Sequence, residues 1–282
     1  KYLEFINLLE LENSVKLKRA FKKSDILERE NIIRQEVIEN ISPLEWKNIA
    51  NPYYVGFGNP NSKILIIGKE KAFSFDNKNL LIKESINNYI QWKEILSSYS
   101  LKENQNKVNK EIGFSPVLPK AYHSGKTKGR HTWKIISELI NQTIKESKEL
   151  EETNYLENSI FNECFLTELN YIPAKYNEGT GLTEIRKQFL TQSFYKTFPV
   201  VIIGAKSYIK RKTEEQIKEI FNAEYHSEIY LDTIGKTRRR NLVLKKYKSN
   251  TQTIFICDQL SGASGWTKKS LTKFAKEITG DV

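Results

Sequence analysis

The sequence is poor in the residues that bind metals and form disulfides. It contains two cysteines and three histidines among 282 residues, and their spacings are not those of a zinc site. Cys164 and Cys257 both lie in apolar, strand-like runs. This position favours buried free thiols in a reducing compartment. We therefore expect neither a metal nor another cofactor.

Long hydrophobic runs are also missing. No apolar stretch approaches the roughly 20 residues that cross a bilayer, and the first residues do not show the charged-then-apolar pattern of a secretory signal. Hydrophobic residues nevertheless make up 39% of the chain and aromatic residues 11%, which is enough for a packed core. We expect a soluble, cytoplasmic protein without a membrane partner. The oligomeric state is left open.

A complete phosphate-binding loop is absent as well. Residues Ser124–Thr127 resemble the end of a P-loop. That motif requires a glycine five positions before Gly125, where the sequence has Lys120, and no apolar strand precedes it. These differences argue against a P-loop nucleotide site.

Basic residues, in contrast, are abundant. The formal net charge is +11, which favours a polyanion such as nucleic acid as a partner, although a lysine-rich composition with solvated side chains explains it equally well. Two basic segments are candidate contacts for a DNA backbone: Lys126, Lys128 and Arg130 ahead of a helix, and Arg238 and Arg239 in a hairpin or loop. The alternative for the first segment is a mobile basic loop, and for the second a solvated basic face.

The chain divides into two parts by pattern. Residues 1–50 have apolar positions at mixed three- and four-residue steps and predict a helical extension, which stops near Pro43. Residues 51–282 alternate predicted strands with predicted helices. The strands are expected at 63–68, 160–169, 199–203 and 253–257, and the helices at 79–112, 132–149, 182–197, 206–222 and 266–278.

Strands that alternate with helices imply right-handed crossovers and a parallel sheet covered on both faces. We therefore predict an α/β fold: a three-layer α/β/α sandwich with a central parallel sheet of about four strands, plus the N-terminal helical extension. Sites in such sheets form at the carboxyl ends of the strands. The residues that follow each strand are thus the candidates for function.

The first strand ends in Gly68 and is followed by Lys69 and Glu70. A carboxylate at this position can orient a water molecule or stabilise a developing cation; the alternative is a solvated charge in a surface loop. Phe73 and Phe75 come next. Their rings can stack on a flipped base or simply pack in the core.

The second strand leads to Asn170, whose amide can read the edge of a base or form a turn before Pro173. The last strand leads to a turn of small and hydroxyl-bearing residues. In this turn Ser261 and Ser264 suit approach to a phosphate, and Leu260 suits an apolar wedge into a base stack. An ordinary strand-to-helix turn is the alternative.

Taken in order, five segments resemble those of the uracil-DNA glycosylase superfamily over about residues 52 to 279. The segments are Ile64–Phe73, Gly125–Arg130, Phe165–Pro173, Val200–Lys206 and Ile254–Ser261. They correspond, respectively, to the buried strand with its catalytic carboxylate or amide, the Gly/Arg loop, the strand that ends in a base-contacting Asn, the third strand, and the closing motif.

The resemblance implies a DNA glycosylase that hydrolyses the N-glycosidic bond of a flipped, non-standard base in double- or single-stranded DNA. It assigns catalysis to Glu70 and Asp258. It also implies a set of base-binding residues: Gly68, Lys69, Ala72, Phe73, Phe75, Asn170 and Gln259.

Two departures from the family pattern bear on the substrate. Asp258 or Gln259 stands where the closing motif usually has a histidine, and Ala72 stands where uracil-specific members have a bulky tyrosine. A small residue at that position admits a base larger than uracil. Because the closing histidine is absent, a catalytically decayed nucleic-acid-binding module is an alternative. A nucleotide- or phosphate-ester-processing enzyme ranks last.

Overall fold

The computed structural model describes residues 54–69, 88, 132–147, 163–171, 182–206, 209, 213–235 and 239–280. The predicted extension over residues 1–50 lies outside this part of the chain. So does the predicted helix over 79–112, except for Asn88, which is helical.

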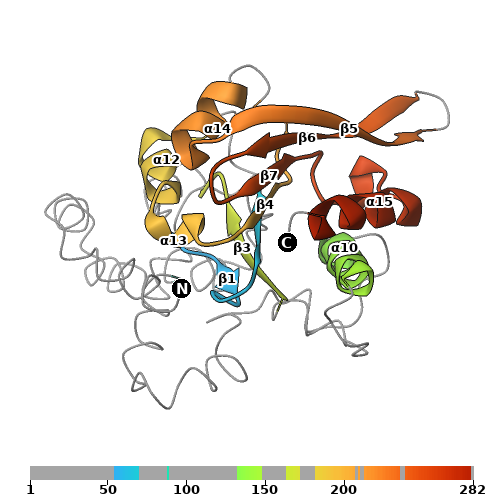
Figure 1. The fold of residues 1–282 in the computed structure, drawn as a ribbon, viewed down its shortest axis with the longest axis horizontal. Coiled ribbons are helices and arrows are strands. Elements are labelled where there is room, and N and C mark those ends of the chain that lie inside the picture. The colour runs from blue at the N-terminus through green and yellow to red at the C-terminus, as the bar shows by residue number, and fades with distance from the viewer. Residues whose placement is uncertain are drawn as a thin grey trace, which may run out of the picture.

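Among the described residues, one mixed sheet of seven strands forms the centre of the fold (Figure 1). Its strand order is β1-β3-β2-β4-β7-β6-β5. The strands are β1 (Phe57–Gly58), β2 (Ile64–Gly68), β3 (Cys164–Glu168), β4 (Val200–Ile203), β5 (Glu224–Ile234), β6 (Arg240–Lys248) and β7 (Thr253–Ile256).

Four neighbouring strands, β3, β2, β4 and β7, are parallel, and each coincides with a predicted strand. The predicted α/β class is therefore confirmed. The predicted number of about four strands is too low, because β1 pairs antiparallel with β3 and the β5–β6 hairpin adds antiparallel strands to β7. Strand β5 has mostly exposed positions, so its sequence lacks the apolar run by which a buried strand is recognised.

Helices pack on both faces of the sheet. Helices α12 (Glu184–Leu190), α13 (Ser193–Lys196) and α14 (Thr213–Phe221) share one apolar cluster with Leu65 and Ile67 of β2. Helices α10 (Thr132–Glu146) and α15 (Lys268–Thr279) share the other with Ile64 and Ile66. Successive strand residues point to opposite faces, so a continuous apolar strand contributes to both clusters. Figure 1 shows the helices on both sides of the sheet.

The strand order creates a switch point beside β2. From β2 the chain crosses to β3 on one side, and it later enters β4 on the other side of β2. In doubly wound sheets, ligands bind in the crevice at the carboxyl ends of strands where the order reverses in this way. The predicted site at Gly68 lies at this switch point.

Both cysteines are buried and neither forms a disulfide, as their apolar surroundings predicted. Burial raises the pKa of both thiols, which keeps them protonated and poorly reactive. Within the described part of the chain, no helix is long and apolar enough to cross a membrane.

Candidate active site

Backbone hydrogen bonds continue past the strand ends and hold β2 against β3. The amide of Leu169 donates to the carbonyl oxygen of Gly68 at 2.9 Å, and the amide of Asn170 donates to that of Lys69 at 2.9 Å. Two predicted base-binding residues, Lys69 and Asn170, are thus brought together by main-chain bonds. The Asn170 side chain is 2% exposed, so its amide lies inside the protein at this edge of the sheet.

The ends of β4 and β7 are joined to the same edge. The amide of Gly204 donates to the carbonyl oxygen of Ile67 at 2.9 Å. The backbone amide of Lys206 donates to the carbonyl oxygen of Cys257 at 3.1 Å. Because Cys257 immediately precedes Asp258, all four parallel strands deliver their following residues to one edge. The structure therefore gathers at this edge the predicted residues of three separate segments.

Glu168 lies at this edge beside Gly68, although sequence reasoning did not assign it to the site. It is the last residue of β3 and lies opposite Gly68 in the register of the parallel pair. A Cβ atom added to Gly68 would lie 2.1 Å from the Glu168 Oε2 atom. The missing side chain of Gly68 thus makes room for the carboxylate, whose Oε2 atom is buried. In the sequence, only its position at the end of a predicted strand indicated that Glu168 belongs to the site.

A buried guanidinium fixes the main chain at the end of β3. Arg186 of α12 donates to the carbonyl oxygen of Glu168 from Nε at 3.0 Å and from Nη2 at 2.7 Å. It also donates to the Thr167 hydroxyl at 2.8 Å and to the Tyr54 carbonyl oxygen at 2.6 Å. Burial lowers the pKa of Arg186. Its role in the fold was not visible in the sequence, where it is one basic residue in an amphipathic helix.

The closing turn after β7 is tied to the β5–β6 hairpin by an ion pair. The Asp258 carboxylate accepts a hydrogen bond from Nη1 of Arg240, and Nη2 of the same guanidinium donates to the Ser264 carbonyl oxygen at 2.9 Å. Asp258, predicted to be catalytic, is therefore held by a cation from β6. Arg239, a predicted backbone contact, is exposed beside this pair.

The other residues of this turn have different surroundings. Leu260 is 3% exposed and packs against Gly204, so it is a core residue rather than a wedge presented to a base stack. The Gln259 residue is exposed, and its carbonyl oxygen accepts a hydrogen bond from Trp266 Nε1 at 2.9 Å. The hydroxyls of Ser261 and Ser264 lie 3.3 Å apart and remain partly accessible.

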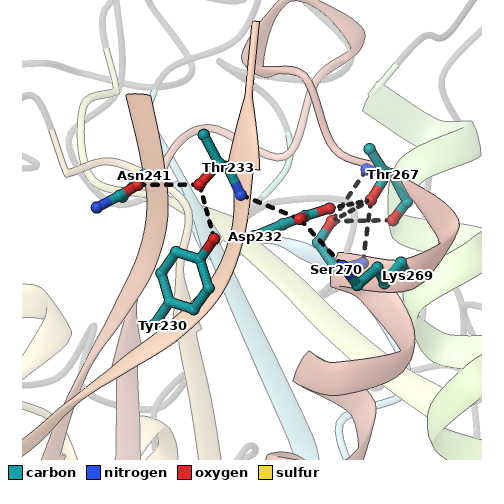
Figure 2. A network of polar contacts seen from close by, with 7 residues as sticks. All are labelled: Tyr230, Asp232, Thr233, Asn241, Thr267, Lys269 and Ser270. Carbon is teal, nitrogen blue, oxygen red and sulfur yellow. Dashed lines mark hydrogen bonds and ion pairs between the residues drawn. The ribbon is translucent and has the colours of Figure 1, made fainter. Parts of the chain in front are cut away.

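Figure 2 shows how the N-terminus of α15 is joined to β5. Thr267 caps the helix by accepting a hydrogen bond from the Ser270 amide at 3.1 Å. The Asp232 carboxylate accepts from the Thr267 hydroxyl at 3.2 Å and lies 3.4 Å from Lys269 Nζ. The helix N-terminus, which would otherwise attract a phosphate, is thus already next to an anion.

A chain of side-chain contacts extends this network across the hairpin (Figure 2). The Tyr230 hydroxyl lies 2.7 Å from that of Thr233, which donates to Asn241 Oδ1 at 3.2 Å. Burial alone would raise the pKa of Asp232, but the Thr233 N–H and the Lys269 ammonium hold it below its usual value. The carboxylate therefore stays ionised at neutral pH.

Several predicted site residues lie outside the described part of the chain. They are Glu70, Ala72, Phe73, Phe75, Lys126, Lys128, Arg130 and Arg238. Glu70 directly follows Lys69, the last described residue of that segment. Among the described residues, no group of three or more His, Cys, Asp or Glu side chains is placed to hold a metal.

Comparison with known proteins found no match to any family model, curated protein or solved structure.

Proposed function

We propose that the protein is a DNA glycosylase that hydrolyses the N-glycosidic bond of a flipped, non-standard base. The observation that carries the proposal is that Lys69, Asn170 and Asp258 follow strands that end at the same edge of the parallel sheet, where a main-chain hydrogen bond joins Asn170 to Lys69. Glu70 directly follows Lys69 in the sequence. Parallel sheets bind ligands at such an edge. The domain proposed for this activity is a three-layer α/β/α sandwich over residues 51–282, acting on double- or single-stranded DNA in the cytoplasm.

In the proposed reaction, the bond between C1′ of the sugar and the base nitrogen breaks, and its electron pair leaves with the base. The oxygen of a water molecule bonds to C1′. One proton of that water passes to the Glu70 carboxylate and then to the departing base. The products are a free base and an abasic sugar, which balances the reaction without a metal or redox partner.

Binding of the base is assigned to groups around the same edge. The buried amide of Asn170 is assigned to the edge of a base, because an amide carries both acceptor and donor groups. Phe73 or Phe75 supplies the aromatic face for stacking. The small side chain of Ala72 leaves room for a base larger than uracil. The exposed Arg239, the Ser261 and Ser264 hydroxyls and the remaining basic residues contact the backbone.

Glu70→Gln tests the catalytic assignment. The amide keeps the size of the side chain but is a poor proton acceptor, so base release is expected to fall by about tenfold or more. The measurement is release of base, or formation of alkali-labile abasic sites, from oligonucleotides that carry a panel of modified bases. Glu163→Gln, at the opposite end of β3, is the matched control and should retain native activity.

Two outcomes would contradict these assignments separately. Undiminished base release by Glu70→Gln would remove Glu70 from the mechanism. Absence of an abasic product from every substrate with the native protein would exclude the glycosylase itself.

A nucleic-acid-binding module without catalytic activity is the second candidate function. The observation that favours it is the ion pair between Asp258 and Arg240: the residue in the place of the family's closing histidine is joined to a cation of the fold. DNA binding that weakens steeply with salt, without any abasic product, would favour this module over the enzyme.

A further inference from the structure

Glu168 is the one carboxylate that the described residues place directly on the switch-point strand β2. Its Oε2 atom lies where the side chain of a larger residue at position 68 would be. The β2–β3 register sets Glu168 opposite Gly68, and the hydrogen bond from the Leu169 amide to the Gly68 carbonyl oxygen holds this register at 2.9 Å. The sheet thus fixes the main chain that carries the carboxylate.

The main chain that carries this carboxylate is held from the other face of the sheet. Arg186 donates twice to the Glu168 carbonyl oxygen and once to the Thr167 hydroxyl. Neighbouring side chains on a strand point to opposite faces. Because Thr167 points toward Arg186, the Glu168 side chain leaves the strand on the opposite face, where it reaches Gly68. The main chain at Glu168 therefore has little conformational freedom to lose when a substrate binds.

The negative charge of Glu168 limits which part of a nucleotide it can contact favourably. A carboxylate repels a phosphate, so it is misplaced beside the DNA backbone. It is well placed beside a sugar whose C1′ and ring oxygen gain positive charge as the glycosidic bond breaks. The chain has a net charge of +11, which attracts DNA through its basic residues. An acidic group at this point does not add to that attraction.

We propose that Glu168 is a second catalytic carboxylate, which contacts the deoxyribose of the flipped nucleotide and stabilises its positive charge in the transition state. This assignment rests on the proposed glycosylase function and adds to it. Glu70 takes the proton of the attacking water, and Glu168 acts through its negative charge without taking up a proton. Glu168 forms no covalent bond, and the balance of the hydrolysis is unchanged.

The test uses the full-length protein and two DNA duplexes that lack a base. One contains a pyrrolidine in place of the target sugar, which is protonated at neutral pH and mimics the cationic transition state; the other contains the uncharged tetrahydrofuran. The native protein is expected to bind the cationic duplex about tenfold or more tightly than the neutral one. Glu168→Gln should reduce this ratio to below about twofold while leaving the affinity for the neutral duplex within about threefold.

Glu163→Gln is the matched control, because it removes the same charge just before β3 begins; its ratio should equal that of the native protein. Circular dichroism of each variant verifies the fold. If Glu168→Gln keeps the cationic preference, or weakens binding of both duplexes equally, the proposal is overturned. Neither probe has a base, so a ratio that depends on Glu168 supports contact with the sugar and excludes a role limited to reading the base.

The same experiment distinguishes this proposal from the glycosylase function. Base release by the native protein on the modified-base panel measures hydrolysis and does not depend on the duplex ratio. A Glu168-dependent ratio without base release would support the sugar-facing carboxylate and contradict hydrolysis. Base release together with a native ratio near one would support the glycosylase and contradict the role of Glu168.

Discussion

Replacement of Trp266 by alanine is expected to lower the free energy of unfolding by about 3 to 5 kcal/mol. Trp266 is 1% exposed and stacks on Phe274 of α15, with ring centroids 6.0 Å apart. Alanine leaves a large cavity between the sheet and α15 and removes the hydrogen bond to the Gln259 carbonyl oxygen. Urea unfolding followed by circular dichroism at 222 nm measures the loss.

Trp266→Phe separates packing from the hydrogen bond. Phenylalanine keeps an aromatic ring against Phe274 but has no N–H to hold Gln259, so a smaller loss of about 1 to 2 kcal/mol is expected. A loss for Trp266→Ala no larger than that for Trp266→Phe would contradict the cavity argument. The hydrogen bond also holds the turn that carries Asp258 and Ser261. Under the proposed function, both variants should therefore weaken DNA binding more than an equally destabilising substitution elsewhere.

Replacement of Arg186 by methionine is expected to lower the free energy of unfolding by about 2 to 4 kcal/mol. Methionine fills the space of the arginine stem but leaves three oxygen atoms without this donor: the buried Tyr54 carbonyl oxygen and Thr167 hydroxyl, and the partly buried Glu168 carbonyl oxygen. Release of a desolvated charge offsets part of the cost. The measurement is again unfolding in urea.

Lys187→Met provides the matched control on the next residue of α12. Its ammonium forms ion pairs with Glu184 at 3.3 Å and Glu219 at 2.8 Å, both of which are largely exposed. Pairs of this kind contribute no more than about 1 kcal/mol. Equal losses for Arg186→Met and Lys187→Met would show that the buried hydrogen bonds do not stabilise the fold as argued.

The parallel strands were predictable because they are buried on both faces. Each appears in the sequence as a short, continuous apolar run, such as Ile64–Ile67 or Val200–Ile203, and no tertiary information is needed to recognise it. The amphipathic helices α10 and α15 were recognised for the same reason. Together these elements determined the α/β class and placed Gly68 at the end of a strand.

The antiparallel part of the sheet was not predictable in this way. Strand β5 is mostly exposed and contains Glu224, His226 and Glu228, so only its pairing with β6 makes it a strand. Polar residues in a half-exposed strand resemble those of a loop. The prediction of a hairpin or loop at Arg238 and Arg239 agrees with the antiparallel pairing of β5 and β6. The ion pair of the next residue, Arg240, with Asp258 was not predictable, because it depends on the pairing of β6 with β7.

The sequence by itself determined which segments are buried and that their ends carry Lys69, Asn170 and Asp258. Only the tertiary structure decided which of these ends are neighbours, because strand order depends on the crossovers and not on the pattern within any strand. It also decided that Glu168 lies on Gly68 and that Arg186 holds its main chain. The apolar pattern of each segment indicates which of its residues are buried. Contacts between residues that are distant in the sequence form only when the strands are aligned in register.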